Sequence, residues 1–83
     1  MKIAAVQLNP TIGDVEANTA RILDGFARAT SAGAELVVFP EQSILGYPAK
    51  DLLLRREVIE QNLAALQRIV AATAGLQAGV IVG

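Results

Sequence analysis

Three short apolar runs alternate with two longer segments of helical periodicity, and this alternation constrains the fold of the chain more than any other feature. The runs cover residues 2–8, 36–39 and 78–82, and the first two stop at Asn9-Pro10 and at Pro40. Runs of this length and punctuation are typical of buried strands. Strands separated by helices pair in parallel through right-handed crossovers. The sequence therefore predicts an α/β fold in the order βαβαβ.

The two intervening segments have the spacing of amphipathic helices. Asp14 is positioned to cap the first helix, which we expect to end near Ser31 with Gly33 as a left-handed terminator. Its apolar positions are Val15, Thr19, Ile22, Leu23, Phe26 and Ala29. The second pattern runs from Glu57 to Gly75. Its apolar positions are Ile59, Leu63, Leu66, Ile69, Val70 and Thr73. Residues 42–54 interrupt both patterns and predict a long loop.

Composition excludes several classes of protein. With 53% hydrophobic and 18% charged residues the chain is core-forming, and its net charge of −1 gives no footprint for nucleic acid or for an anionic membrane. The first apolar run is too short for a signal or membrane segment, so we expect a cytoplasmic protein. The absence of Cys and His removes thiol nucleophiles, imidazole bases, zinc sites and disulfides from residues 1–83.

The size of the chain indicates that it is part of something larger. A chain of 83 residues buries only roughly 60% of the surface that its unfolded form exposes. The last apolar run ends at residue 82 with nothing after Gly83 to cover it. We therefore expect a single domain fragment with a C-terminal remainder, and an exposed third strand that favours a homo-oligomer.

Glu41 is the leading candidate for chemistry. It directly follows Val-Val-Phe-Pro, where an apolar strand meets a loop, and the C-terminal ends of parallel strands are where α/β proteins place their sites. Partial desolvation at such a point would suit the carboxylate to general base catalysis. The alternative is a solvated acid of the kind that commonly ends a strand.

Other polar residues carry weaker signals. Tyr47 could line a ligand pocket or simply anchor the loop, whereas Lys50 and Asp51 fit an exposed pair. Ser43 has neither a histidine partner nor a glycine-flanked elbow, so a serine hydrolase is not supported. Gln7, Asn9 and Thr11 end the first strand and either face the crevice beside Glu41 or serve the turn. A single glycine, Gly13, in that turn argues against a dinucleotide loop.

Two motifs resemble a known superfamily. The segment 37–48, Val-Val-Phe-Pro-Glu-Gln-Ser-Ile-Leu-Gly-Tyr-Pro, follows Lys-Ile-Ala-Ala-Val-Gln-Leu-Asn-Pro at 2–10, and both resemble the opening of nitrilases, or carbon-nitrogen hydrolases. Residues 46–55, together with Thr-Ile-Gly-Asp at 11–14 and Asn18, look more specifically like the glutaminase domain of bacterial glutamine-dependent NAD+ synthetases. The resemblance spans essentially the whole chain.

The resemblance implies a fold and a chemistry. Residues 1–83 would form the N-terminal βαβαβ part of an α-β-β-α sandwich whose active site is a Glu-Lys-Cys triad. Glu41 matches the general base and Tyr47 a position near the substrate, whereas Lys2 and Lys50 do not match the triad lysine. Glutamine would be the substrate, no cofactor would bind this part, and a second domain would use the ammonia with ATP and magnesium for NAD+ synthesis.

Other functions remain open on the sequence alone. Within the superfamily the alternatives are an aliphatic amidase, a nitrilase or a carbamoylase with another pocket. Outside it they are a non-catalytic nucleotide-binding βαβ half-domain, which the lone Gly13 disfavours, and an assembly module of the same fold.

We predict that residues 1–83 alone do not hydrolyse glutamine, because they contain no cysteine to attack the amide. Ammonia release from glutamine by the purified chain tests this. A rate that depends on the chain and is abolished by Glu41→Gln would contradict the prediction.

Overall fold

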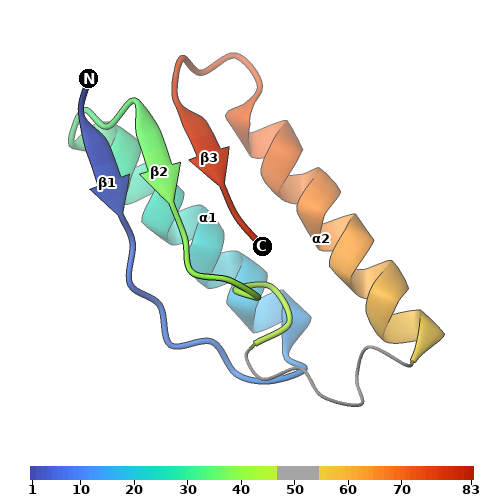
Figure 1. Ribbon diagram of the computed structural model, residues 1–83. Helices are drawn as coiled ribbons and strands as arrows, with labels where there is room; N and C mark the ends of the chain where they lie inside the picture. The colour runs from blue at the N-terminus through green and yellow to red at the C-terminus, as the bar shows by residue number, and fades with distance from the viewer. Residues whose placement is uncertain (47–54) are drawn as a thin grey trace.

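The computed structural model describes residues 1–46 and 55–83, and it contains a parallel sheet with two helices (Figure 1). The elements in chain order are β1 (Ile3–Ala5), α1 (Val15–Ser31), β2 (Leu36–Val38), α2 (Arg56–Thr73) and β3 (Gly79–Ile81). The predicted βαβαβ order is therefore confirmed, and both helices begin and end within two residues of the predicted positions.

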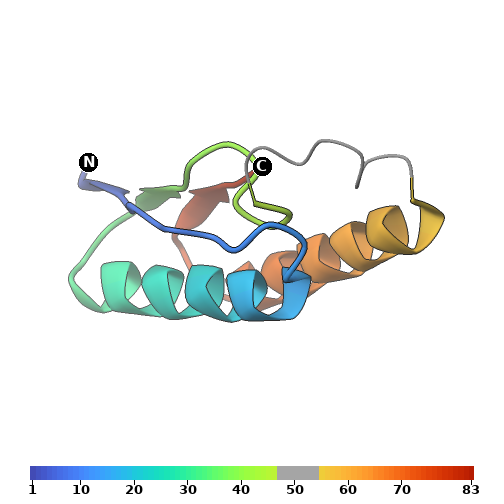
Figure 2. The same ribbon diagram turned by 90° about the horizontal axis from the view of Figure 1, so that it is seen from below.

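The central strand is β2, which pairs in parallel with β1 on one side and with β3 on the other. Both crossovers advance in the same direction across the sheet. Right-handed crossovers in one direction place their helices on one face, and Figure 2 shows α1 and α2 together on the same side of the sheet. The sheet therefore has one covered face and one open face.

Strand alternation decides which side chains enter the core. Val37 is fully buried, and its register partners Ala4 and Val80 pack partly buried against the same core. The neighbouring rows point the other way, so Ile3 and Ile81 are 60% and 55% exposed. The open face of the sheet is therefore apolar.

The predicted ends of α1 are confirmed. The Asp14 carboxylate accepts a hydrogen bond from the Ala17 amide at 3.1 Å and so caps the first turn. At the other end Gly33 has φ +94°, and the Ala34 amide donates to the Ala29 carbonyl at 3.0 Å. This is a Schellman ending, in which glycine adopts the left-handed conformation without a Cβ penalty.

The buried side of helix α2 differs from the one predicted from its apolar positions, and only Ile69 belongs to both. Val58, Ala65 and Ile69 are buried. The exposed residues of the same helix include Ile59, Leu63, Leu66 and Val70. Apolar residues occupy more than one side of α2, and the sheet and α1 cover only one of those sides. The small Ala65 side chain marks the side where α2 lies close to its neighbours.

The first strand is shorter than the predicted 2–8 run. Its bonds with the β2 segment run from the Glu35 amide, which donates to the Lys2 carbonyl, to the Val6 amide, which donates to the Val38 carbonyl at 2.8 Å. The Phe39 amide then donates to the Ile81 carbonyl, on the β3 side. The chain after Val6 therefore leaves the sheet and crosses its C-terminal edge. Among the helices of the described residues, none has the length and apolar character needed to cross a membrane.

We predict that Ile22→Ala lowers the free energy of unfolding by about 2–5 kcal/mol, because Ile22 is completely buried and its loss leaves a cavity. The matched control is Ile59→Ala in α2, because Ile59 is 43% exposed, and its expected loss is about 1 kcal/mol. Urea denaturation followed by circular dichroism measures both. Equal losses would mean that the buried stripe is assigned incorrectly.

Candidate active site

Glu41 lies where the C-terminal end of β2 meets the segment that leaves β1. Phe39 is buried at the end of the strand, and Pro40 and Glu41 come to the surface directly after it. A pocket with a volume of about 320 Å³ is formed there by Leu8, Asn9, Pro10, Pro40 and Glu41. The two strand ends therefore meet at one edge of the sheet, as parallel pairing requires.

The environment of Glu41 differs from the expected partial desolvation. Its side chain is exposed, although the preceding Phe39 and the following Ser43 are both buried. The reason is local, because the strand ends at Val38 and the chain reaches the surface at Pro40 and Glu41, where a turn begins. Within residues 1–46 and 55–83, the carboxylate is therefore open to a reacting group that approaches from outside.

The turn that follows Glu41 is fixed by short-range hydrogen bonds. The buried Ser43 hydroxyl donates to the Pro40 carbonyl, and the Gly46 amide donates to the Gln42 carbonyl at 2.7 Å. Gln42 has a left-handed φ of 52°, which non-glycine residues rarely adopt. The engagement of Ser43 within the turn agrees with its rejection as a nucleophile.

This turn also packs directly on the connection between β1 and α1. The Gly13 amide donates to the Leu45 carbonyl at 2.7 Å. Gly46 has φ +89°, and a Cβ built on it would lie 2.7 Å from the Ile12 Cα atom and 2.9 Å from the Thr11 carbonyl oxygen. Only glycine fits here, because both the backbone conformation and the close approach of another backbone exclude a side chain.

Asn18 is the residue whose position the sequence did not explain. It lies on the buried side of α1 and is only 1% exposed. Its Nδ2 group donates to the Thr11 carbonyl at 2.7 Å and to the Ile44 carbonyl at 2.9 Å, while its Oδ1 atom accepts from the Thr11 amide at 2.8 Å. The sequence offered two signals for Asn18: its place among the residues that resemble the synthetase branch, and its polar side chain beside the packed stripe of the helix.

The remaining sequence candidates are distributed differently. Asn9 shares the pocket with Glu41, whereas Gln7 is exposed outside the set that lines it. Thr11 is held through its backbone by Asn18. Lys2 belongs to the opposite edge of the sheet, where its Nζ donates to the Ala32 carbonyl at 2.5 Å. Tyr47, Lys50 and Asp51 fall outside the described residues.

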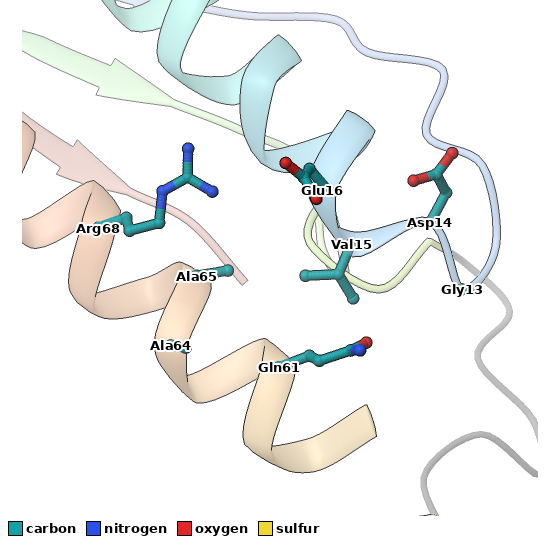
Figure 3. A pocket seen from close by; sticks show the side chains of 8 residues that line it. All are labelled: Gly13, Asp14, Val15, Glu16, Gln61, Ala64, Ala65 and Arg68. Carbon is teal, nitrogen blue, oxygen red and sulfur yellow. The ribbon is translucent and has the colours of Figure 1, made fainter. Parts of the chain in front are cut away.

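A second hollow lies in the helical layer between the first turn of α1 and the middle of α2 (Figure 3). Its volume is about 340 Å³. The lining residues are Gly13, Asp14, Val15, Glu16, Gln61, Ala64, Ala65 and Arg68. Gln61 and Arg68 extend from α2 toward α1, and Asp14 is already engaged as the helix cap. No residue of this lining is shared with the Glu41 pocket.

The described residues contain no group of three or more Asp, Glu, His or Cys side chains with a geometry suited to a metal ion. By the resemblance, the expected ATP and magnesium belong to another domain and not to residues 1–83. Glu41 is the one carboxylate among the described residues that line the pocket at the C-terminal edge of the sheet, and it supplies the acid-base chemistry available there.

Residues 2–83 match the protein family described as carbon-nitrogen hydrolase. The chain is 36% identical over its 83 residues to a glutamine-dependent NAD(+) synthetase of Thermotoga maritima, and it covers 14% of that protein. It is also 43% identical over 81 residues, 96% of the chain, to a synthetase of the same name from Xanthomonas campestris, of which it covers 15%. The chain therefore spans a small part of the length of these relatives.

Solved structures of the same group share the fold. The crystal structure of a glutamine-dependent NAD(+) synthetase from Cytophaga hutchinsonii matches 94% of the chain with a TM-score of 0.85 and 32% identity, over 13% of that structure. The synthetase of Acinetobacter baumannii in complex with ADP matches 98% of the chain with a TM-score of 0.86 and 31% identity, over 15% of that structure. The predicted nitrilase-type fold is therefore confirmed for the residues described.

We predict that Gly46→Ala destabilises the chain more than Gly75→Ala does. Both glycines have positive φ, so both substitutions cost about 1–2 kcal/mol in backbone strain, but only the Gly46 Cβ would meet another backbone within 4 Å. Thermal denaturation of the two variants measures the difference. A loss for Gly46→Ala no larger than that for Gly75→Ala would show that the two loops separate without cost.

Proposed function

Since the chain belongs to the carbon-nitrogen hydrolase family, we propose that it forms the N-terminal part of a glutaminase domain in which Glu41 is the general base. The observation that supports this role is the position of Glu41, exposed at the C-terminal end of the central strand and beside the pocket shared with Asn9. Glutamine as the substrate follows from the similarity to proteins named glutamine-dependent NAD(+) synthetase.

The proposed reaction begins with a proton transfer to Glu41. The carboxylate accepts the proton of a cysteine thiol supplied from outside residues 1–83, and the thiolate attacks the carbon of the glutamine side-chain amide. A lysine, also from outside these residues, stabilises the oxyanion of the tetrahedral intermediate. Glu41 then returns the proton to the leaving nitrogen, the C–N bond breaks, and ammonia departs.

The same carboxylate serves the second half of the reaction. Glu41 accepts a proton from water as the water oxygen attacks the thioester. The C–S bond then breaks to release glutamate, and Glu41 returns the proton to the leaving sulfur to regenerate the thiol. The exposure of Glu41 among the described residues is compatible with this role, because both the thiol and the water must reach its carboxylate.

The product ammonia defines the place of this domain in the whole protein. We propose that a second domain consumes it in an ATP- and magnesium-dependent amidation that forms NAD+. The names of the relatives, glutamine-dependent NAD(+) synthetase, support the use of glutamine and the formation of NAD+. Tyr47 is the proposed substrate contact of residues 1–83. A cytoplasmic location and a homo-oligomeric state complete the proposal.

We predict that Glu41→Gln in the complete protein lowers glutamine-dependent NAD+ formation by about 100- to 10,000-fold, because the amide cannot accept the thiol proton. NAD+ formation with added ammonium salt should stay near the wild-type rate, since that reaction bypasses the glutaminase. Both rates are measured by the appearance of NAD+.

The matched control is Glu35→Gln, which removes an exposed carboxylate from the opposite end of β2. It should preserve both rates. Glutamine-dependent activity that survives Glu41→Gln would contradict the assignment, and equal loss of both activities would indicate a general folding defect.

A further inference from the structure

The hydrogen bonds of Asn18 reach two loops that are far apart in the sequence. Thr11 lies in the connection between β1 and α1, and Ile44 lies in the turn after Glu41, 26 residues beyond Asn18. The first loop also supplies Asn9 and Pro10 to the pocket, and the second follows Glu41 directly. One buried side chain therefore connects the two walls of the pocket.

The side-chain amide suits this position because it uses both of its halves. Nδ2 donates both of its hydrogens to carbonyl oxygens, and Oδ1 accepts from the Thr11 amide and from Arg21 Nη1 at 3.2 Å. The flipped amide would direct its oxygen at two carbonyl oxygens. A buried amide with all its bonds made is rigid, whereas one with unmet bonds is costly. Asn18 thus sets a fixed distance between the loops.

Resting on the glutaminase function proposed above, we propose that Asn18 is a positioning residue for catalysis. Through the Ile44 carbonyl it fixes the turn that carries Glu41, and through Thr11 it fixes that turn against the opposite wall of the pocket. The backbone contact between Gly46 and Ile12 and the bond from Gly13 to Leu45 strengthen the same junction. A displacement of about 1 Å at a reacting group is enough to reduce a rate about 100-fold.

The substitution Asn18→Asp tests this with almost no change in shape. The carboxylate still accepts from the Thr11 amide and stays beside Arg21, but it has no hydrogen to donate to the Thr11 and Ile44 carbonyls. The turn after Glu41 therefore loses its link to α1. The matched control is Thr19→Val. Thr19 is equally buried, and its hydroxyl donates to the Val15 carbonyl at 2.6 Å, a bond within α1 that reaches neither loop.

The experiment uses the complete protein and measures kcat and KM for glutamine together with ammonia-dependent NAD+ formation. We expect Asn18→Asp to lower kcat for glutamine hydrolysis about 10- to 100-fold, with KM and the ammonia-dependent rate close to wild type. Thr19→Val should keep all three values even where its thermal stability falls. Asn18→Ala, which adds no charge, is the second variant and should lower kcat in the same way.

The outcomes separate the two proposals. A wild-type protein that makes NAD+ from ammonia but does not hydrolyse glutamine would overturn the proposed function itself. An active wild type with unchanged kcat in a folded Asn18→Asp or Asn18→Ala variant would overturn the positioning role alone. Loss of kcat in Thr19→Val to the same extent, or failure of both Asn18 variants to fold, would mean that Asn18 serves stability and not positioning.

Discussion

The parallel pairing of β2 on both of its edges is the constraint on which the rest of the structure depends. Because β2 is the middle strand, both crossovers run in the same direction and place α1 and α2 on one face of the sheet. The same pairing makes Val37 the most deeply buried residue of the sheet. It also places Phe39, Pro40 and Glu41 at the C-terminal end of the central strand, between the ends of β1 and β3. The strand order therefore determines where Glu41 lies, independently of the side chains around it.

The sequence predicted those features that depend on neighbouring residues. The Asp14 cap, the Gly33 ending of α1 and the arrival of Glu41 after an apolar strand are all local patterns with a single structural solution. The role of Asn18 and the close contact at Gly46 depend on loops that meet only in the folded chain, so periodicity carried no information about them. The buried side of α2 could not be predicted for a related reason. The helix has apolar residues on more than one side, and only contacts made in the folded chain decide which side is buried.

The turn after Glu41 contains a strained residue that surrounding hydrogen bonds hold in place. Strained backbone of this kind is common at functional sites. Gln42 is held in a left-handed conformation that costs an ordinary residue about 1–2 kcal/mol, and its Oε1 atom is buried without a hydrogen-bond partner among the described residues. The surrounding bonds offset this cost, since Ile44 donates to the Gly83 carbonyl and Gly46 donates to Gln42 itself. A turn so constrained has little freedom to move the carboxylate that precedes it.

The contact between Gly46 and the backbone at Thr11 and Ile12 also limits how the chain can change in length over evolution. An insertion in either loop would displace two backbone segments that are in contact, and it would therefore displace Glu41. At Gly75, by contrast, a Cβ atom would have no neighbour within 4 Å, so the connection between α2 and β3 has room to change. Insertions and deletions should therefore accumulate between α2 and β3, while the chain lengths from Pro10 to Asn18 and from Pro40 to Gly46 stay constant.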